Sequence, residues 1–230
     1  MKLRHAAPVM ATAVVLIGCT NANDSAPRPE QEGVTRASAC AYPLAGEPVK
    51  PVDPPSENDV INTGEAKVTV HMTAGDLEIT MDRATAPCTV NSFVSLAQQG
   101  WFDDTSCHRL VDHGIFVLQC GDPSGRGTGG PGYTIPDELT PNTTSLEKVD
   151  NDNVNYPPGT VAMANAGPET GGSQWFIVWD NTPLPPDYAV FGKVDAAGLE
   201  VVRGIAAQGV DAADRMTPIA EAKITSVTLG

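Results

Sequence analysis

The stretch VAMANAGPETGGSQWFIV, residues 161–178, combines two strand-like ends with a middle of small residues. Its ends are apolar like those of buried strands, whereas glycine, alanine and two amide side chains occupy the interior. It holds no histidine, no cysteine and one carboxylate, Glu169. The residues of this segment alone leave open what chemistry, if any, it performs.

Short strand-like segments lie on both sides of this stretch. Apolar and polar residues alternate over 68–72 and 77–81, and the TAGD sequence between them (73–76) predicts a hairpin turn. Further apolar runs predict strands at 115–118, 161–164, 176–179, 190–194 and 224–229.

Helical spacing is confined to two segments. One covers residues 90–97, with Thr89 as a candidate N-cap and Gly100 as the stop. The other covers 199–206, with Asp195 as a candidate cap. Many short strands, abundant glycine and proline and only two helices predict an all-β barrel or sandwich.

The charge of the chain limits its partners. Among 230 residues, 14 are Lys or Arg and 28 are Asp or Glu, which gives a formal net charge of −14. Phosphate backbones require basic patches, so we expect no nucleic-acid partner.

The N-terminus has the features of an export signal. Lys2 and Arg4 precede an apolar run at 6–17, which is too short for a mature helix that spans a bilayer. The run ends in LIGC, residues 16–19, which resembles the lipobox of bacterial lipoproteins. That resemblance implies a signal peptide at 1–18 and lipidation of Cys19; the alternative is an ordinary signal peptide with a chance cysteine. The expected location is the extracytoplasmic face of the cell membrane, through the lipid anchor.

Residues 19–62 are rich in proline and small polar residues, a composition that predicts a tether rather than a core. Residues 63–230 then form a single domain, which we expect to be monomeric.

Four cysteines remain after Cys19, an even number that favours disulfides in an oxidising compartment. Four cysteines allow three pairings, and composition does not choose among them. No pair has Cys-x-x-Cys spacing, so we expect no metal site. Cys107 and Cys120 lie at the two ends of a predicted hairpin and can face each other. Pairing them leaves Cys40–Cys88, which would staple the distal tether to the domain.

One glycine-rich motif does not fit its usual role. GRGTGG, residues 125–130, matches the G-x-G-x-x-G pattern of dinucleotide-binding loops. It lacks the preceding strand and the following helix that such a loop needs, so we expect neither a nucleotide nor another cofactor.

Five segments carry a family resemblance: CHRLV (107–111), FVLQCGD (116–122), MANAGP (163–168), GSQWFI (172–177) and VFGKV (190–194). In this order and spacing they closely resemble the cyclophilin family of peptidyl-prolyl isomerases. The resemblance extends over most of the predicted domain. It implies an eight-stranded antiparallel β-barrel, closed at each end by a helix.

The resemblance also implies roles for individual residues. Arg109 donates to the imide nitrogen of an X–Pro bond as that bond twists, and three residues form the catalytic group: Arg109, Gln119 and Phe116. The implied substrate-binding residues are Val117, Ala164, Asn165, Gln174, Phe176, Leu184 and Tyr188. His108 is interpreted as a structural histidine, because the reaction transfers no proton overall.

The chain departs from the family pattern near the groove. Val117 stands where the family usually has methionine, Pro183 where it has tryptophan, and Tyr188 where it has histidine. Two extra residues lengthen the loop after Arg109. The predicted function is isomerisation of X–Pro bonds in unfolded exported proteins. The alternative is a proline-peptide binding module or holdase with weak or no catalysis.

Overall fold

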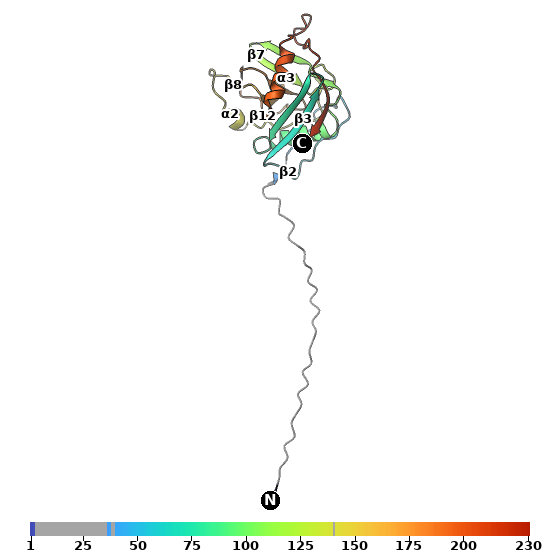
Figure 1. Ribbon diagram of the computed structural model, residues 1–230, viewed down its shortest axis with the longest axis vertical. Coiled ribbons are helices and arrows are strands. Elements are labelled where there is room, and N and C mark those ends of the chain that lie inside the picture. Colours follow the sequence, from blue (N-terminus) through green and yellow to red (C-terminus); the bar gives the residue numbers. More distant parts are fainter. Residues whose placement is uncertain (3–35, 38–39, 140) are drawn as a thin grey trace. The chain divides into compact units, whose positions relative to one another are not determined.

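The computed structural model describes residues 1–2, 36–37, 40–139 and 141–230. The chain divides into two units, Met1–Glu32 and Gly33–Gly230, and nearly all described residues belong to the second (Figure 1). The predicted signal peptide beyond Lys2 and the predicted lipidation site Cys19 lie outside the described residues. Within the described part of the chain, no helix is both long and apolar enough to cross a membrane.

A nine-stranded antiparallel sheet forms the centre of the second unit. In spatial order its strands are β5 (Thr105–Ser106), β13 (Lys223–Leu229), β3 (Glu65–Met72), β4 (Gly75–Asp82), β12 (Val190–Val194), β9 (Thr160–Met163), β10 (Trp175–Val178), β7 (Ile115–Cys120) and β6 (Arg109–His113). Two small sheets pair β1 (Arg36–Ala37) with β2 (Val60–Ile61) and β8 (Val154–Tyr156) with β11 (Thr182–Leu184). The mostly-β prediction is therefore confirmed.

The closed eight-stranded barrel is not found in the described residues. The sheet has nine strands, and its end strands β5 and β6 do not pair with each other. β5 is only two residues long, so it has few main-chain groups with which another strand could pair. On one side of the gap Cys107 N–H continues the β5–β13 pairing to the Ala222 carbonyl (2.8 Å), and on the other side Leu110 N–H of β6 donates to the Met216 carbonyl in the loop before β13 (2.7 Å). We call this gap between the sheet ends the seam.

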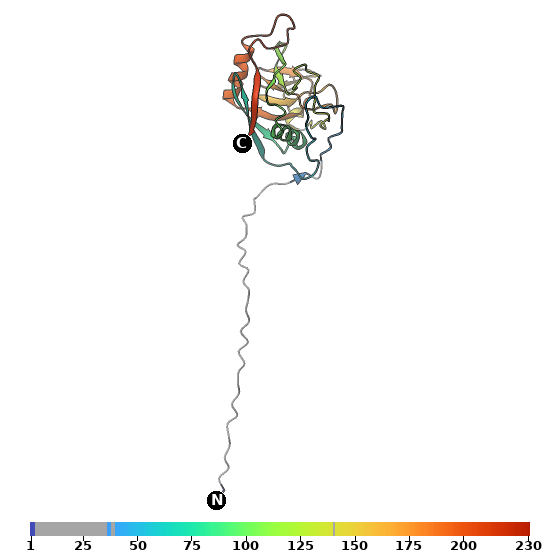
Figure 2. The same ribbon diagram turned by 90° about the vertical axis from the view of Figure 1, so that its right-hand side faces the viewer.

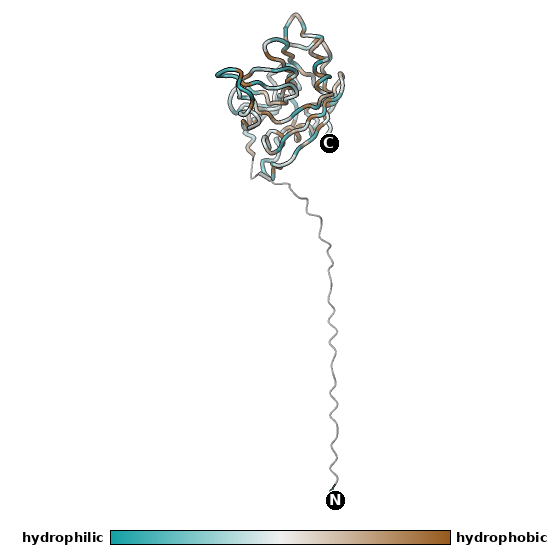
Figure 3. Tube along the Cα trace, turned by 60° about the vertical axis from the view of Figure 1, so that its left-hand side comes forward, coloured by the Kyte–Doolittle hydropathy of each residue, from teal (hydrophilic) through white to brown (hydrophobic). Residues whose placement is uncertain are grey.

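The predicted first hairpin is confirmed. Strands β3 and β4 pair over their full length, from Glu65 opposite Asp82 to Met72 opposite Gly75. Ala66, Val68 and Val70 are buried, whereas Lys67 is exposed and Thr69 is partly exposed, as the period of two requires. Figure 3 shows hydrophobic (brown) and hydrophilic (teal) stretches interspersed along the second unit.

Two longer helices and one short one complete the fold. They are α1 (Pro87–Gln98), α3 (Ala196–Ala206) and the four-residue α2 (Pro141–Thr144). Figure 2 shows α1 in green and α3 in orange, packed against separate parts of the sheet. The predicted Asp195 cap is confirmed, because its side chain accepts the Gly198 N–H at 2.9 Å.

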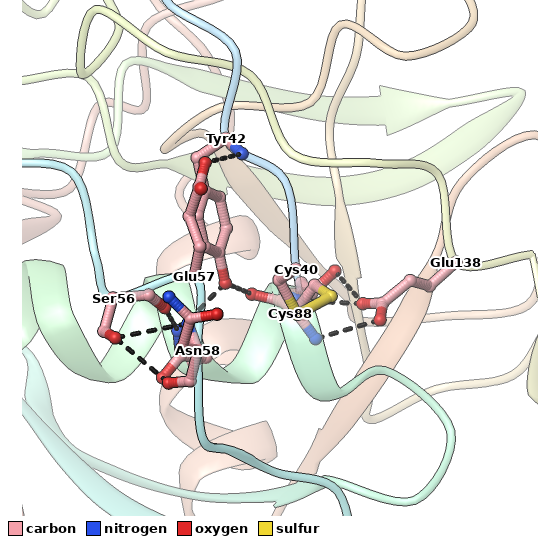
Figure 4. The surroundings of a disulfide bond; sticks show 9 residues. Cys40, Tyr42, Ser56, Glu57, Asn58, Cys88 and Glu138 are labelled. Carbon is pink, nitrogen blue, oxygen red and sulfur yellow. Dashed lines mark hydrogen bonds between the residues drawn. A yellow bond between two sulfur atoms is a disulfide. The ribbon is translucent and has the colours of Figure 1, made fainter. Parts of the chain in front are cut away.

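The predicted Thr89 cap of the first helix is wrong. The helix begins earlier, with Ala86 as N-cap and Pro87 at the first helical position. Ala86 has no side-chain acceptor. The carboxylate of Glu138 accepts the N–H groups of Cys88 (2.9 Å) and Thr89 (2.8 Å) instead (Figure 4). The cap therefore comes from a loop about 50 residues away in sequence.

The predicted disulfide Cys40–Cys88 is present and ties the N-terminal part of the unit to α1 (Figure 4). Tyr42 is buried beside it and donates its hydroxyl to the Cys88 carbonyl at 2.9 Å. We call residues 40–52 the N-terminal arm. Although its composition predicts a tether, it packs on the domain, as a disulfide at Cys40 requires.

The second predicted disulfide, Cys107–Cys120, is also present, and both of its cysteines are buried. It joins the chain just before β6 to the end of β7.

Candidate active site

The hairpin of β6 and β7 brings two predicted catalytic residues together. The register places Arg109 directly opposite Gln119, so their side chains lie on the same face. Arg109 Nη1 donates to Gln119 Oε1 at 3.2 Å. The Cys107–Cys120 disulfide lies within two residues of each partner and so restricts both ends of this pair.

A relay of amides extends from this pair. Gln119 Nε2 donates to Gln174 Oε1 at 2.8 Å, and Gln174 Nε2 donates to the Gly129 carbonyl at 2.9 Å. Each amide is thereby held in one orientation, and the oxygen of Gln119 faces Arg109. One bond occupies one of the five guanidinium N–H donors, so the group is oriented and retains donors for a ligand.

A cavity of about 290 Å³ lies beside the arginine. Eight of the predicted site residues line it: Arg109, Val117, Gln119, Ala164, Asn165, Phe176, Leu184 and Tyr188. Segments from five different strands or strand ends thus converge on one hollow.

Two predicted site residues lie elsewhere. Phe116 is not among the lining residues; its ring packs edge-on against Trp179, with centroids 4.9 Å apart. Successive side chains of a strand point to opposite faces, so Val117 and Gln119 face the cavity and Phe116 does not. Gln174 also does not line the cavity, and it contacts the site through its hydrogen bond with Gln119.

Aromatic rings form the far wall. Phe176 and Tyr188 meet edge to face at 5.4 Å, and the Tyr156 hydroxyl donates to the Tyr188 carbonyl at 3.3 Å. Pro183 is not in the lining; it pairs with Asn155 in the β8–β11 ladder. The Tyr188 ring is therefore the departure from the family pattern that directly shapes this wall.

The main chain after β9 is only partly available. Ala164 N–H donates to the Gln174 carbonyl at 3.0 Å, so it serves the fold. The Asn165 side chain donates to the Asp187 carbonyl at 2.8 Å and fixes the loop that follows. The Ala164 N–H and the Asn165 side chain are therefore both engaged within the chain.

Sequence reasoning missed five lining residues: His108, Ile115, Arg126, Gly127 and Met216. Ile115 was detectable, because it precedes Val117 by two on the same strand. Arg126 and Gly127 belong to the glycine-rich motif that fits no nucleotide loop. Nothing in the sequence around Met216 marks it as a site residue. The hydrogen bond from Leu110 N–H to the Met216 carbonyl holds the Met216 loop next to β6.

The lining has basic but no acidic side chains. Burial lowers the pKa of His108, which favours the neutral ring near pH 7 and agrees with a structural role. The described residues that line the cavity include no carboxylate, serine or cysteine. Among the described residues, no group of three or more His, Cys, Asp or Glu side chains is placed to hold a metal ion. The arrangement can bind an apolar ring beside a fixed cationic donor.

Comparisons with known proteins agree with this geometry. Residues 67–229 match the family described as cyclophilin type peptidyl-prolyl cis-trans isomerase/CLD. A Mycobacterium tuberculosis protein described as a probable peptidyl-prolyl cis-trans isomerase B is 46% identical over 196 residues, which cover 83% of this chain and 63% of that protein. The chain thus spans less than two thirds of that relative's length.

A crystal structure of a cyclophilin type peptidyl-prolyl cis-trans isomerase from Cryptosporidium parvum is similar with a TM-score of 0.60 and 28% identity. The similarity covers 73% of this chain and 98% of that one. A second structure of that protein, determined in the presence of the dipeptide Ala-Pro, gives a TM-score of 0.59. The chain therefore belongs to the cyclophilin-type peptidyl-prolyl cis-trans isomerase family, whose enzymes form class EC 5.2.1.8.

Proposed function

We propose that this chain accelerates cis–trans isomerisation of X–Pro bonds, and that Arg109 supplies the main stabilisation of the twisted state. One observation carries the proposal: the amide relay holds the Arg109 guanidinium at the edge of a cavity that has an apolar wall. The cavity has room for a proline ring, with Val117, Phe176 and Leu184 as its apolar lining.

The reaction needs no nucleophile. Resonance holds the X–Pro bond planar, and rotation faces a barrier of about 18–20 kcal/mol. As the bond twists, the nitrogen loses conjugation and regains a lone pair that can accept a hydrogen bond. A fixed donor directed at that lone pair stabilises the twisted state more than the planar ground state. Lowering the barrier by about 7 kcal/mol gives a rate increase of roughly 10⁵-fold.

The test is a cis-to-trans assay on residues 33–230, with a short peptide containing one X–Pro bond. We expect clear acceleration by the parent chain and a loss of about 10²- to 10³-fold in kcat/KM in Arg109→Ala, because one charged donor is removed. Arg83→Ala is the matched control, since Arg83 does not line the cavity. Near-parental turnover in Arg109→Ala contradicts the assigned role.

The alternative function is binding without turnover. The Tyr188 ring favours it, because it packs against Phe176 and occupies part of the proline wall. The same assay separates the two functions. A parent chain that binds the peptide but leaves the uncatalysed rate unchanged is a binding module or holdase.

We also propose that the protein acts on unfolded exported proteins, as a monomer anchored at the extracytoplasmic membrane face through Cys19. The LIGC sequence at 16–19 and the two disulfides support this, because disulfides persist in oxidising compartments. Cys19→Ser is expected to release the protein from the membrane fraction or leave its precursor uncut. A variant that fractionates and migrates like the parent contradicts the anchor.

A further inference from the structure

A second cavity, of about 610 Å³, adjoins the first. The two share four lining residues: Gln119, Gly127, Ala164 and Asn165. Because they share one edge, a peptide with its proline in the first cavity places a neighbouring side chain at the second. The second cavity therefore acts on the same ligand as the first.

One wall of the second cavity belongs to the N-terminal arm, through Ala45, Glu47 and Val49. The arm runs beside residues 130–134, and three main-chain bonds hold it there. They are Ala45 N–H to the Gly132 carbonyl (2.8 Å), Val49 N–H to the Gly130 carbonyl (3.2 Å) and Thr134 N–H to the Pro43 carbonyl (2.9 Å).

The glycine-rich loop is shaped for this contact. Gly132 has a φ of +81°, and a Cβ there would lie 2.9 Å from the Pro48 side chain. A Cβ on Gly129 would lie 3.0 Å from Val49 and would also meet the carboxylate of Asp122. Any larger residue at either position would push the arm away or distort the loop. These two glycines let the arm become a wall of the groove.

The arm is also anchored away from the cavity. The Cys40–Cys88 disulfide and the Tyr42 hydroxyl fix its start on α1 (Figure 4). Lys50 donates its ammonium group to the Gly100 carbonyl and fixes the other end. Glu47 lies between these two anchors, so its position relative to the groove is set by the fold.

Among the described residues that line the second cavity, Glu47 is the only one with a charged side chain, and it is exposed. The remaining lining consists of glycines and neutral polar or apolar residues. The charge at this part of the groove is therefore negative, whereas Arg109 and Arg126 make the first cavity positive. A side chain that reaches the second cavity meets a carboxylate and no competing cation there.

We propose that the N-terminal arm, through Glu47, makes the enzyme prefer peptides that carry Lys or Arg close to the isomerising proline. This rests on the proposed function, because it concerns the substrate of the same groove. An exposed ion pair supports a modest preference, about 1.5- to 5-fold in kcat/KM over a neutral side chain.

The test uses peptides with one X–Pro bond and a single Lys, norleucine or Glu, placed in turn two or three residues before or after the proline. Affinity and kcat/KM are measured on the chain that keeps its arm, residues 33–230. We expect at least one position at which Lys exceeds norleucine and Glu falls below it. The difference should shrink at high salt, because the pair is exposed.

Two variants assign the effect to Glu47. In Glu47→Gln the Lys preference at that position should fall to within experimental error, and in Glu47→Lys it should invert. Kinetics with the norleucine peptide should stay within about twofold. Glu65→Gln is the matched control: it removes the same charge from an exposed residue on β3 and should keep the preference.

The readouts separate this inference from the proposed function. A Lys preference in affinity that depends on Glu47, without turnover, supports the arm's role and overturns catalysis. Turnover with no charge preference at any position, or a preference unchanged in both Glu47 variants, overturns the inference alone. Absence of both binding and turnover overturns both.

Discussion

Cys107–Cys120 closes a sequence separation of 13 residues at the end of the sheet, whereas Cys40–Cys88 closes one of 48 between the N-terminal arm and α1. The first lies within two residues of Arg109 and Gln119. The second lies beside Tyr42 and Glu138, at the start of the helix. Both pairs are buried, yet they restrain different things. One restrains the orientation of the Arg109–Gln119 pair, and the other restrains a chain segment that lines the second cavity.

The two disulfides are expected to differ in their effects on stability and on activity. In the chain-entropy account, a longer closed loop removes more freedom from the unfolded chain, about 4 kcal/mol for the longer of these loops and about 3 kcal/mol for the shorter. The arm disulfide is therefore expected to matter more for stability, and the hairpin disulfide more for catalysis.

The largest expected effect is the loss of the arm disulfide. Cys40→Ala/Cys88→Ala should lower the free energy of unfolding by about 4 kcal/mol, because the unfolded chain regains a long loop. Denaturant unfolding measures this change. Isomerisation of an uncharged peptide at 15 °C should remain within about twofold of the parent. A folded variant with strongly reduced turnover would show that the arm also positions the catalytic groups.

Loss of the hairpin disulfide is expected to cost less stability and more activity. Cys107→Ala/Cys120→Ala should lower the unfolding free energy by about 3 kcal/mol. It should also reduce kcat/KM by about tenfold, roughly 1.4 kcal/mol, since Arg109 and Gln119 gain freedom. Parental kcat/KM in the folded variant would remove the contrast between the two disulfides.

A change within the amide relay tests positioning without touching a disulfide. Gln119→Leu removes the acceptor for Arg109 and the donor to Gln174, so we expect a loss of about tenfold in kcat, roughly 1.4 kcal/mol. Gln98→Leu, at an exposed position on α1, is the control. A change confined to KM would mean that Gln119 binds substrate rather than orienting the arginine.

The smallest expected effect is a pH dependence centred on Glu138, which caps α1 beside the arm disulfide. Burial raises the pKa of Glu138 above its ordinary value, although hydrogen bonds from Thr89 and Cys88 oppose the change. The folded chain therefore holds this proton more tightly than the unfolded chain. The stabilisation is present at low pH and is lost as pH rises from the ordinary carboxyl range through the raised pKa.

Urea unfolding of the parent and Glu138→Gln across that range measures this contribution. The variant should show a flatter dependence on pH, because it has no proton to release at residue 138. It should also be less stable at every pH, since one amide oxygen cannot accept both helix N–H groups. A slope identical to that of the parent would place the titration on another group.

Local patterns predicted much of this molecule. The β3–β4 hairpin follows from alternation over residues 68–81, and the Asp195 cap follows from a residue next to its helix. The site residues on β7 and β10 came from a family resemblance, and eight of the ten proposed side chains line one cavity. Phe116 did not, because strand alternation turns it toward Trp179.

Contacts between distant segments were not predictable in the same way. Glu138 caps a helix about 50 residues away, and no spacing rule connects it to Cys88. The position of the N-terminal arm depends on main-chain hydrogen bonds to residues 130–134. Such bonds involve no particular side chain, so the sequence does not predict them. The open seam likewise depends on the length of β5, which is only two residues. The strand propensity of individual residues does not predict the length of a strand to within one or two residues.

The open seam has a consequence for how copies of the chain meet. β6 is an end strand, and unpaired strand edges promote edge-to-edge association between molecules. This edge is short, carries Arg109, Asp112 and His113, and has its Leu110 N–H already bonded to the loop that contains Met216. These features are the usual protection against intermolecular strand pairing. The strand that holds Arg109 thus has the features that discourage aggregation through its own edge.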